Sequence, residues 1–336
     1  MGTARTRTAR IRTAAKAAGA AALSLALAGT LGGCGLVSGS PMTDDVHPGS
    51  VGAGKPLKGA ELTVTSKEFT ESIVLGQLMG LVFRAAGADV VDRTSIQGSV
   101  GAREAVRTGA ADAMYEYTGT SWITYLGHAK PIADSRKQYE AVRKEDAGQG
   151  LSWLPPSTLN NTYAIAVNDR TQKKYGLKTL SDVAELSKKD PKAVTLCLDN
   201  EFASRDDGLN GMTKAYGMRI PASQVQKMSS GVVYTQVAKG APCSMGIVYT
   251  TDGRIPAMKL NVLTDDRHFF PNYDAAPEIN SATLKKHPQI AKVLNPVTEA
   301  LDNHEAQKMN AKVDVDGQDP HQVAKDWLVE KGFIKP

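Results

Sequence analysis

Two stretches of similar outline decide the fold of this chain, DAMYEYTGT (112–120) and SMGIVYTTDG (244–253). Each joins a run of small and apolar residues to a tyrosine, a threonine and then a glycine, which is typical of a buried strand that ends in a turn. A helical segment that ends at a glycine, Gly109 or Gly240, precedes each of them. The chain therefore uses one structural plan twice, and we expect two lobes built on that plan.

The sequence further upstream of each stretch supports this duplication. AELTVTSKEF (60–69) and AVTLCLDNEF (193–202) both have the pattern of a strand that runs into a polar loop with Glu-Phe, and a helical pattern follows each. Strands that alternate with helices indicate a parallel, doubly wound α/β sheet. Residues 272–336 are predicted to be mostly helical and to pack on the first lobe.

The duplicated plan sets the expected domain boundaries, because a chain of this length is more typical of two cores than of one. We expect lobe 1 to comprise residues 59–161 and 265–336, and lobe 2 to comprise residues 162–264. The hinge crossings then lie near residues 160 and 265, and a ligand cleft lies between the lobes.

The N-terminus has the composition of an export signal. Within residues 1–33, five cations and no acid precede an Ala/Leu-rich run that ends in small residues. LGGC (31–34) resembles the bacterial lipobox, which implies that Cys34 becomes a lipidated N-terminus on the extracytoplasmic face of the membrane. The alternative is an ordinary secretory signal in which Cys34 is incidental. Residues 34–58, rich in Gly, Ser and Pro, are predicted to form a flexible tether.

Charge and cysteine content narrow the classes of partner. The formal net charge of +5 equals the five cations of residues 1–33, so the rest of the chain is close to neutral, and nothing points to nucleic acid. Cys197 and Cys243 lie outside the signal. A disulfide between them is permitted outside the cytoplasm, and two buried free thiols fit the sequence equally well.

Catalytic and metal-binding motifs are missing from the sequence. The six histidines are scattered, and the chain has no phosphate-binding loop, no GxSxG and no paired CxxC. Asp206 and Asp207 are adjacent, which is more typical of solvated or capping loop acids than of a catalytic pair. We therefore expect no catalytic residue, no metal and no cofactor.

Four tyrosines are candidates for ligand contacts. In an open α/β sheet, ligands bind beyond the carboxyl ends of the strands. Tyr117 and Tyr249 lie at that end of equivalent strands, whereas Tyr163 and Tyr273 follow the two crossings. Any one of them alone is more typical of a packing residue. Their common placement predicts that all four converge on one cleft.

Two cations occupy matched positions in the predicted lobes. Lys67 and Arg205 each follow a first strand and precede a helix, a place suited to an anion such as a carboxylate. Tyrosine faces beside two cations suit a zwitterion that carries a quaternary ammonium, because that group cannot donate a hydrogen bond. A primary ammonium instead requires an acid in the cage. Glu116 is close in sequence, but it alternates away from Tyr117 along the strand.

Six motifs together resemble the glycine betaine/carnitine/choline substrate-binding lipoproteins of osmoprotectant ABC importers, over about residues 60–334. The motifs are SKEFTES (66–72), YEYTGT (115–120), NNTYAIAV (160–167), EFASRDDG (201–208), YTTDGRI (249–255) and DDRHFFPNYDAAP (265–277). The resemblance implies a type II periplasmic-binding-protein fold with two doubly wound lobes that close over the ligand. It also implies a monomer that delivers the solute to an ABC permease with its ATPase subunit.

The resemblance also implies roles for individual residues. The aromatic cage falls on Tyr117, Tyr163, Tyr249 and Tyr273. The carboxylate contacts fall on Lys67, Thr120 and Arg205, and Asn161 lies near the ammonium. A neutral hydroxyl at Thr120 can donate to a carboxylate, which favours glycine betaine, proline betaine or carnitine over choline.

Three alternatives stay open at this point. An amino-acid or polyamine receptor on the same fold predicts a ligand with N–H donors. An extracytoplasmic hydrolase requires a nucleophile or an acid–base pair in the cleft. A lipid-anchored partner of a sensor uses the same binding chemistry as a transport protein, and the sequence does not separate the two.

Overall fold

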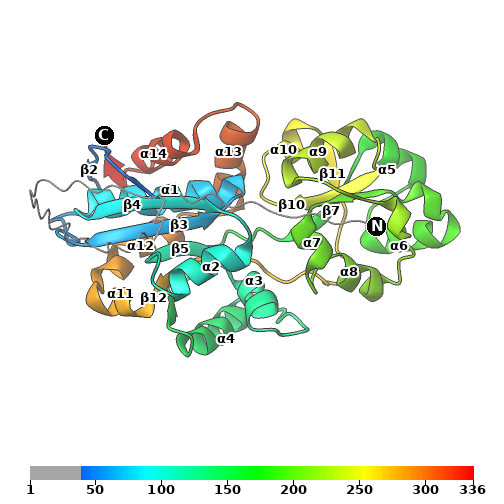
Figure 1. Ribbon diagram of the computed structural model, residues 1–336. Coiled ribbons are helices and arrows are strands. Elements are labelled where there is room, and N and C mark those ends of the chain that lie inside the picture. The colour runs from blue at the N-terminus through cyan, green and yellow to red at the C-terminus, as the bar shows by residue number, and fades with distance from the viewer. Residues whose placement is uncertain (1–38) are drawn as a thin grey trace, which may run out of the picture. The chain divides into compact units, whose positions relative to one another are not determined.

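Two β-sheets organise the part of the chain that the computed structural model describes, residues 39–336 (Figure 1). The predicted signal peptide and Cys34 lie outside these residues. Together the described elements form one compact unit. None of the helices between residues 39 and 336 combines the length and apolar character that crossing a bilayer requires.

The first sheet has the strand order β1-β4-β3-β5-β12-β6. β3 pairs in parallel with β4 and β5, whereas β12 runs antiparallel to β5 and β6. The strands are β1 (Ser40–Pro41), β3 (Glu61–Lys67), β4 (Asp89–Ile96), β5 (Ala113–Tyr117), β6 (Leu151–Trp153) and β12 (Ala275–Asn280).

The second sheet has the order β11-β7-β10-β8-β9 and repeats this arrangement. β8 pairs in parallel with β9 and β10, and β7 runs antiparallel to β10 and β11. The strands are β7 (Tyr163–Asn168), β8 (Leu196–Leu198), β9 (Val225–Lys227), β10 (Met245–Tyr249) and β11 (Leu260–Val262).

The antiparallel strands mark where the chain changes sheets. It leaves the first sheet after β6 and enters the second as β7, then leaves after β11 and returns as β12. The crossing segments, 154–162 and 263–274, are joined by the bridge between Asn160 and Asp274. A parallel, doubly wound sheet was the expectation, and the parallel course is wrong for β1, β7 and β12. β7 and β12 arrive across the hinge without the helix that a parallel connection requires.

The helices cover the sheets, and α1 (Thr70–Ala85) is the most buried of the long helices. It is apolar around most of its surface because it lies between the first sheet and three C-terminal helices (Figure 1). These are α12 (Gln289–Glu299), α13 (Asn303–Asp314) and α14 (Pro320–Glu330). The remaining α-helices are α2 (Ser99–Arg107), α3 (Thr118–Thr120), α4 (Ser135–Ala147), α5 (Asp169–Tyr175), α6 (Leu180–Lys189), α7 (Asn200–Ser204), α8 (Leu209–Tyr216), α9 (Ser230–Lys239), α10 (Arg254–Ala257) and α11 (Ser281–Lys286). The short helical turns are η1 (Ser121–Tyr125), η2 (Pro191–Ala193) and η3 (Ala222–Gln224).

The prediction of a flexible tether over residues 34–58 is wrong for its described part, 39–58. β1 pairs with β4, and β2 (His47–Pro48) pairs with β13 (Ile334–Lys335). Met42 and Leu57 are buried in the main core. The Gly, Ser and Pro residues of this segment form tight turns around a few apolar anchors, so composition alone concealed its packing.

Candidate ligand-binding site

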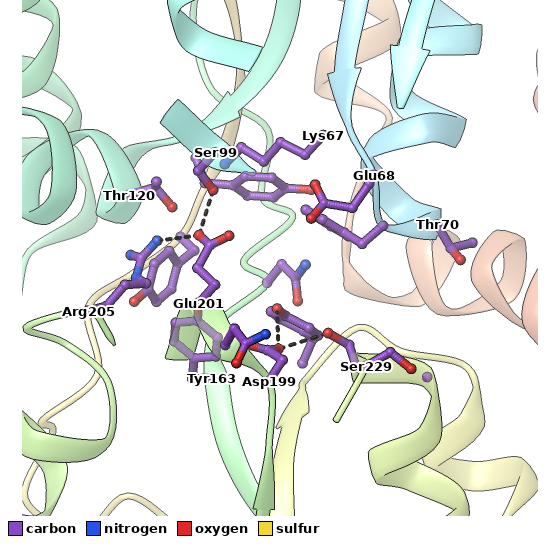
Figure 2. Close-up of a pocket in the computed structure, with 18 of the residues that line it drawn as sticks. Lys67, Glu68, Thr70, Ser99, Thr120, Tyr163, Asp199, Glu201, Arg205 and Ser229 are labelled. Carbon is purple, nitrogen blue, oxygen red and sulfur yellow. Dashed lines mark hydrogen bonds and ion pairs between the residues drawn. The ribbon is translucent and has the colours of Figure 1, made fainter. Parts of the chain in front are cut away.

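A cavity of about 540 Å³ is lined by residues from both sheets and from the crossing segments (Figure 2). All eight residues predicted to contact a ligand line this cavity. They are Lys67, Tyr117, Thr120, Asn161, Tyr163, Arg205, Tyr249 and Tyr273.

Strand register explains why the tyrosines meet. Tyr249 is the last residue of β10 and lies directly opposite Tyr163, the first residue of the antiparallel β7. The carboxyl ends of parallel strands and the start of an antiparallel strand share one edge of a sheet. In the first sheet Tyr117 ends β5 in the same way, opposite Ala275 at the start of β12. Tyr273 lies just before β12, on the returning crossing segment.

The aromatic rings form one continuous cluster. The ring centroid of Tyr163 lies 5.3 Å from that of Tyr249 and 5.3 Å from that of Tyr273, whose ring it meets edge-on. Phe69 connects the remaining member, because its ring lies 6.0 Å from Tyr117 and 5.7 Å from Tyr249. Sequence reasoning missed Phe69 as a lining residue, although it lies within the SKEFTES motif.

Carboxylates hold three of the tyrosine hydroxyls. Tyr117 donates to Glu71 at 2.8 Å, Tyr249 donates to Asp199 at 3.4 Å, and Tyr273 donates to Asp207. Burial and nearby negative charge raise the pKa of the Tyr117 and Tyr273 hydroxyls, so both phenols stay neutral. The hydroxyls are therefore engaged with acids while the rings line the cavity.

Lys67, which is predicted to bind an anion, already has an acidic partner within the protein. Its ammonium forms a buried ion pair with Glu116, with Nζ and Oε1 2.5 Å apart, and lies 5.0 Å from the centre of the Tyr117 ring. Glu116 does not line the cavity, in keeping with strand alternation, and pairs with Lys67 instead. The backbone pattern could not show this pairing. Among the described residues, one of the three Lys67 donors is used in this way.

Arg205 is also paired within the protein. Its Nε and Nη2 donate to Asp207 at 2.7 and 2.6 Å, and its Nη1 donates to Glu201 at 3.0 Å. Burial lowers the pKa of Arg205, but the neighbouring Tyr163 and Tyr273 hydroxyls and the Asp207 carboxylate outweigh burial and hold that pKa well above its ordinary value. The expectation that Asp207 is a solvated or capping loop acid is wrong, because its pairing with Arg205 buries it.

Three lining carboxylates were not predicted, namely Glu68, Asp199 and Glu201. Figure 2 shows Glu201 between Arg205 and Ser99, whose hydroxyl donates to it at 2.6 Å. Burial raises the pKa of Glu201, but the positive charges of Lys67 and Arg205 outweigh burial and leave that pKa below its ordinary value. Ser99 begins α2 beside the first sheet and Glu201 lies in α7 beside the second, so this hydrogen bond joins the two.

Thr120 and Asn161 are both buried in the cavity wall. Asn161 donates its backbone N–H to the Tyr273 carbonyl at 3.1 Å and its amide nitrogen to Glu71 at 2.9 Å. Glu71 can only accept a hydrogen bond, so the atom of the Asn161 amide that faces it must be the nitrogen and the other atom must be Oδ1. This Oδ1 has no hydrogen-bond partner among the described residues.

Cys197 and Cys243 are joined by a disulfide, with Cα atoms 5.6 Å apart. Cys197 lies in β8 and Cys243 lies just before β10, in the core of the second sheet. Neither residue lines the cavity.

Two α/β sheets linked by two crossing segments, with a cavity lined from both, define a solute-binding protein of the type II periplasmic-binding-protein fold. This confirms the predicted fold class. Residues 60–330 match the family described as the substrate binding domain of ABC-type glycine betaine transport systems, and this chain belongs to that family. The family assignment made from the six motifs is thereby confirmed.

Relatives agree with this assignment. The chain is 38% identical to the glycine-betaine-binding protein of Pseudomonas aeruginosa, over 81% of this chain and 88% of the relative. It is 31% identical to the glycine betaine-binding protein YehZ of Escherichia coli, over 83% and 94%. A crystal structure titled glycine betaine/carnitine/choline ABC transporter superimposes with a TM-score of 0.67 at 28% identity, covering 81% of this chain and 99% of that one.

Proposed function

We propose that this protein captures a small quaternary-ammonium osmoprotectant outside the cytoplasm and delivers it to an ABC importer. The observation that carries the proposal is the gathering of four tyrosines and Phe69 around one cavity. Aromatic faces attract a methylated ammonium by roughly 0.5 to 2 kcal/mol each and ask for no hydrogen-bond donor from it. Family membership and the names of the relatives support the same ligand class.

The unused donors of the paired cations support a carboxylate at the other end of the ligand. In the described residues Lys67 retains two N–H donors, and Arg205 retains one hydrogen on each Nη atom. With the Thr120 hydroxyl, these groups can hold a carboxylate without breaking the internal ion pairs. We therefore propose glycine betaine, proline betaine or carnitine as preferred ligands, with choline weaker.

The role follows from binding rather than from chemistry. No histidine lines the cavity described here, and the lining acids Asp199 and Glu201 are engaged with Arg205, hydroxyls or backbone N–H groups. We infer that the protein is not an enzyme. Ligand contacts from both sheets favour the closed arrangement, which a permease with its ATPase subunit recognises. Lipidation at Cys34 keeps the protein at the membrane.

A receptor for a primary amine, such as an amino acid or a polyamine, is the second candidate. The lining carboxylates Glu68, Asp199 and Glu201 favour it, because they can accept hydrogen bonds from an ammonium. The two proposals differ in what methylation of the amine does. Trimethylation strengthens binding to an aromatic cage and weakens binding to a carboxylate site.

Calorimetry with glycine betaine, carnitine, proline betaine and choline, beside glycine, proline and putrescine, tests the proposal. We expect a Kd below about 1 mM for at least one quaternary amine and weaker binding of glycine than of glycine betaine. No heat from any quaternary amine refutes the proposed ligand class. Tighter binding of glycine or putrescine supports the second candidate.

A further inference from the structure

Glu71, in the first turn of α1, is a buried carboxylate that the sequence motifs contain but that no predicted role uses. Only 4% of its surface is exposed. Its two oxygens accept four hydrogen bonds. The donors are Tyr117 Oη at 2.8 Å and Asn161 Nδ2 at 2.9 Å on Oε1, and Thr251 Oγ1 at 2.5 Å and Asn310 Nδ2 at 3.0 Å on Oε2.

These donors come from four different places in the fold. Tyr117 ends β5 and Asn310 lies in α13, both beside the first sheet. Thr251 follows β10 of the second sheet, and Asn161 lies on the crossing segment between the sheets. A single carboxylate thus joins the two sheets and the hinge. Asn310 reinforces the connection because its amide also donates to the Thr251 carbonyl at 2.9 Å.

Glu71 differs from several other acids around the cavity in having no cationic partner. Glu116, Asp207 and Glu201 each pair with Lys67 or Arg205, whereas the buried Asp199 bonds only neutral donors, as Glu71 does. No ion pair in residues 39–336 includes Glu71, whose four partners are neutral hydroxyls and amides. Burial raises the pKa of Glu71, and the nearby negative charge of Asp252 adds to this effect.

Two of the four partners connect Glu71 directly to the cavity. Tyr117 and Asn161 both line it, and both present their donor to the carboxylate. A phenol that donates to a carboxylate is polarised, which increases the negative charge on its ring. Asn161 is held with its amide nitrogen on Glu71, so the negative end of the amide dipole faces away from the carboxylate.

We propose that Glu71 is a positioning residue for the ammonium end of the ligand: it holds Tyr117 and Asn161 in place and supplies a negative charge that a bound cation neutralises. This inference rests on the proposed function, because it concerns the same cavity and the same ligand class. On this inference, the preference for a cation comes from the Glu71 carboxylate behind Tyr117 as well as from the aromatic rings that line the cavity.

The test compares two ligands that differ only in charge. Glycine betaine and 3,3-dimethylbutanoate have the same shape, but the second has a carbon in place of the ammonium nitrogen. In Glu71→Gln we expect glycine betaine to bind about tenfold more weakly, with little change for 3,3-dimethylbutanoate in NMR titrations. A purely structural defect weakens both ligands together. Equal weakening of both, or no change in either, overturns the proposal.

Glutamine can be accommodated at this position. In Glu71→Gln the new amide nitrogen can lie toward Tyr117 and Asn161. The Asn161 amide then rotates so that its Oδ1 accepts a hydrogen bond from this nitrogen. That Oδ1 has no hydrogen-bond partner among the described residues, so the rotation breaks no other bond of this oxygen. Glu299→Gln, an exposed acid on α12, is the matched control and should leave both affinities unchanged.

A measurement on the unmodified protein keeps the inference testable if Glu71→Gln fails to fold. A bound cation must stabilise the ionised carboxylate, so glycine betaine should lower the pKa of Glu71 in a carboxyl NMR titration. An unchanged pKa overturns the inference. Failure of the proposed function looks different, because the unmodified protein then binds neither glycine betaine nor any other quaternary amine.

Discussion

Phe69 and Tyr249 stack with their ring planes 7° apart and their centroids separated by 5.7 Å, although Phe69 follows a strand of the first sheet and Tyr249 ends a strand of the second. Both rings line the cavity. The aromatic wall is therefore complete only when the two sheets are held together. This couples ligand affinity to closure.

Replacing Phe69 by leucine tests this coupling. Leucine keeps most of the apolar volume but removes the aromatic face, so we expect the binding of glycine betaine to weaken by about 1 kcal/mol. Calorimetry measures the loss. Phe69→Tyr is the matched control and should bind nearly as well as the unmodified protein. Full affinity in Phe69→Leu shows that Phe69 contributes packing only.

Tyr249 separates the role of the ring from that of the hydroxyl. Tyr249→Ala should weaken ligand binding by about 1 kcal/mol or more, because an aromatic face is lost. Tyr249→Phe should cost little, because the one side-chain hydrogen bond that its hydroxyl makes within residues 39–336, to Asp199, is long at 3.4 Å. Titration calorimetry on both variants checks this order. A large loss in Tyr249→Phe contradicts the aromatic-cage interpretation at this residue.

The ion pair between Lys67 and Glu116 predicts a change in ligand preference. Glu116→Gln removes the negative charge from the Lys67 ammonium and leaves that cation to attract a ligand carboxylate. We expect the ratio of glycine betaine affinity to choline affinity to rise about fivefold, since choline has no carboxylate. Competition binding measures the ratio. Glu140→Gln, which breaks the exposed ion pair with Arg136, is the control and should leave the ratio unchanged. An unchanged ratio in Glu116→Gln excludes Lys67 from carboxylate recognition.

The raised pKa of Glu71 predicts how stability depends on pH. Burial disfavours the ionised form in the folded state, and Tyr117 and Asp252 are the titratable groups that face it. The folded pKa lies above the unfolded value of about 4.3. Stability from this group is therefore fully present below that value and is lost as pH rises through the folded pKa.

Glu71→Gln removes this titration. The free energy of unfolding of the variant, relative to the unmodified protein, should increase as pH rises from about 4.3 through the folded pKa of Glu71 and then level off. Urea denaturation without ligand at several pH values measures the difference. A constant difference across this range means that the pKa of Glu71 is not raised in the folded protein.

The disulfide between Cys197 and Cys243 should affect stability but not affinity. It closes a sequence separation of 46 residues, for which the loop-entropy relation gives about 4 kcal/mol. The double replacement by alanine should lower the unfolding free energy by an amount of that order. Glycine betaine affinity at a temperature where the variant is folded should be unchanged, because neither cysteine lines the cavity. A matching loss of affinity contradicts this separation.

Particular residues show how far the sequence predicts the site. Tyr117 and Tyr249 were predictable because strand patterns place them at strand ends, and the ends of neighbouring strands meet at one edge. Lys67 and Arg205 were predictable as cavity residues for the same reason. Their ion-pair partners were not predictable. Glu116 reaches Lys67 from another strand, and strand or helix periodicity does not relate residues so far apart in the sequence. The antiparallel course of β7 and β12 likewise depends on where the chain crosses between sheets.

The sequence by itself determined the duplicated plan, the fold class, the motifs of the family and eight of the residues that line the cavity. Those properties follow from periodicity and from strand ends, which are local. Only the tertiary structure decided which charges are neutralised and which are not. Glu71 shows the reason: its four partners lie far apart in the chain, and whether a buried carboxylate meets a cation or neutral donors depends on packing between elements.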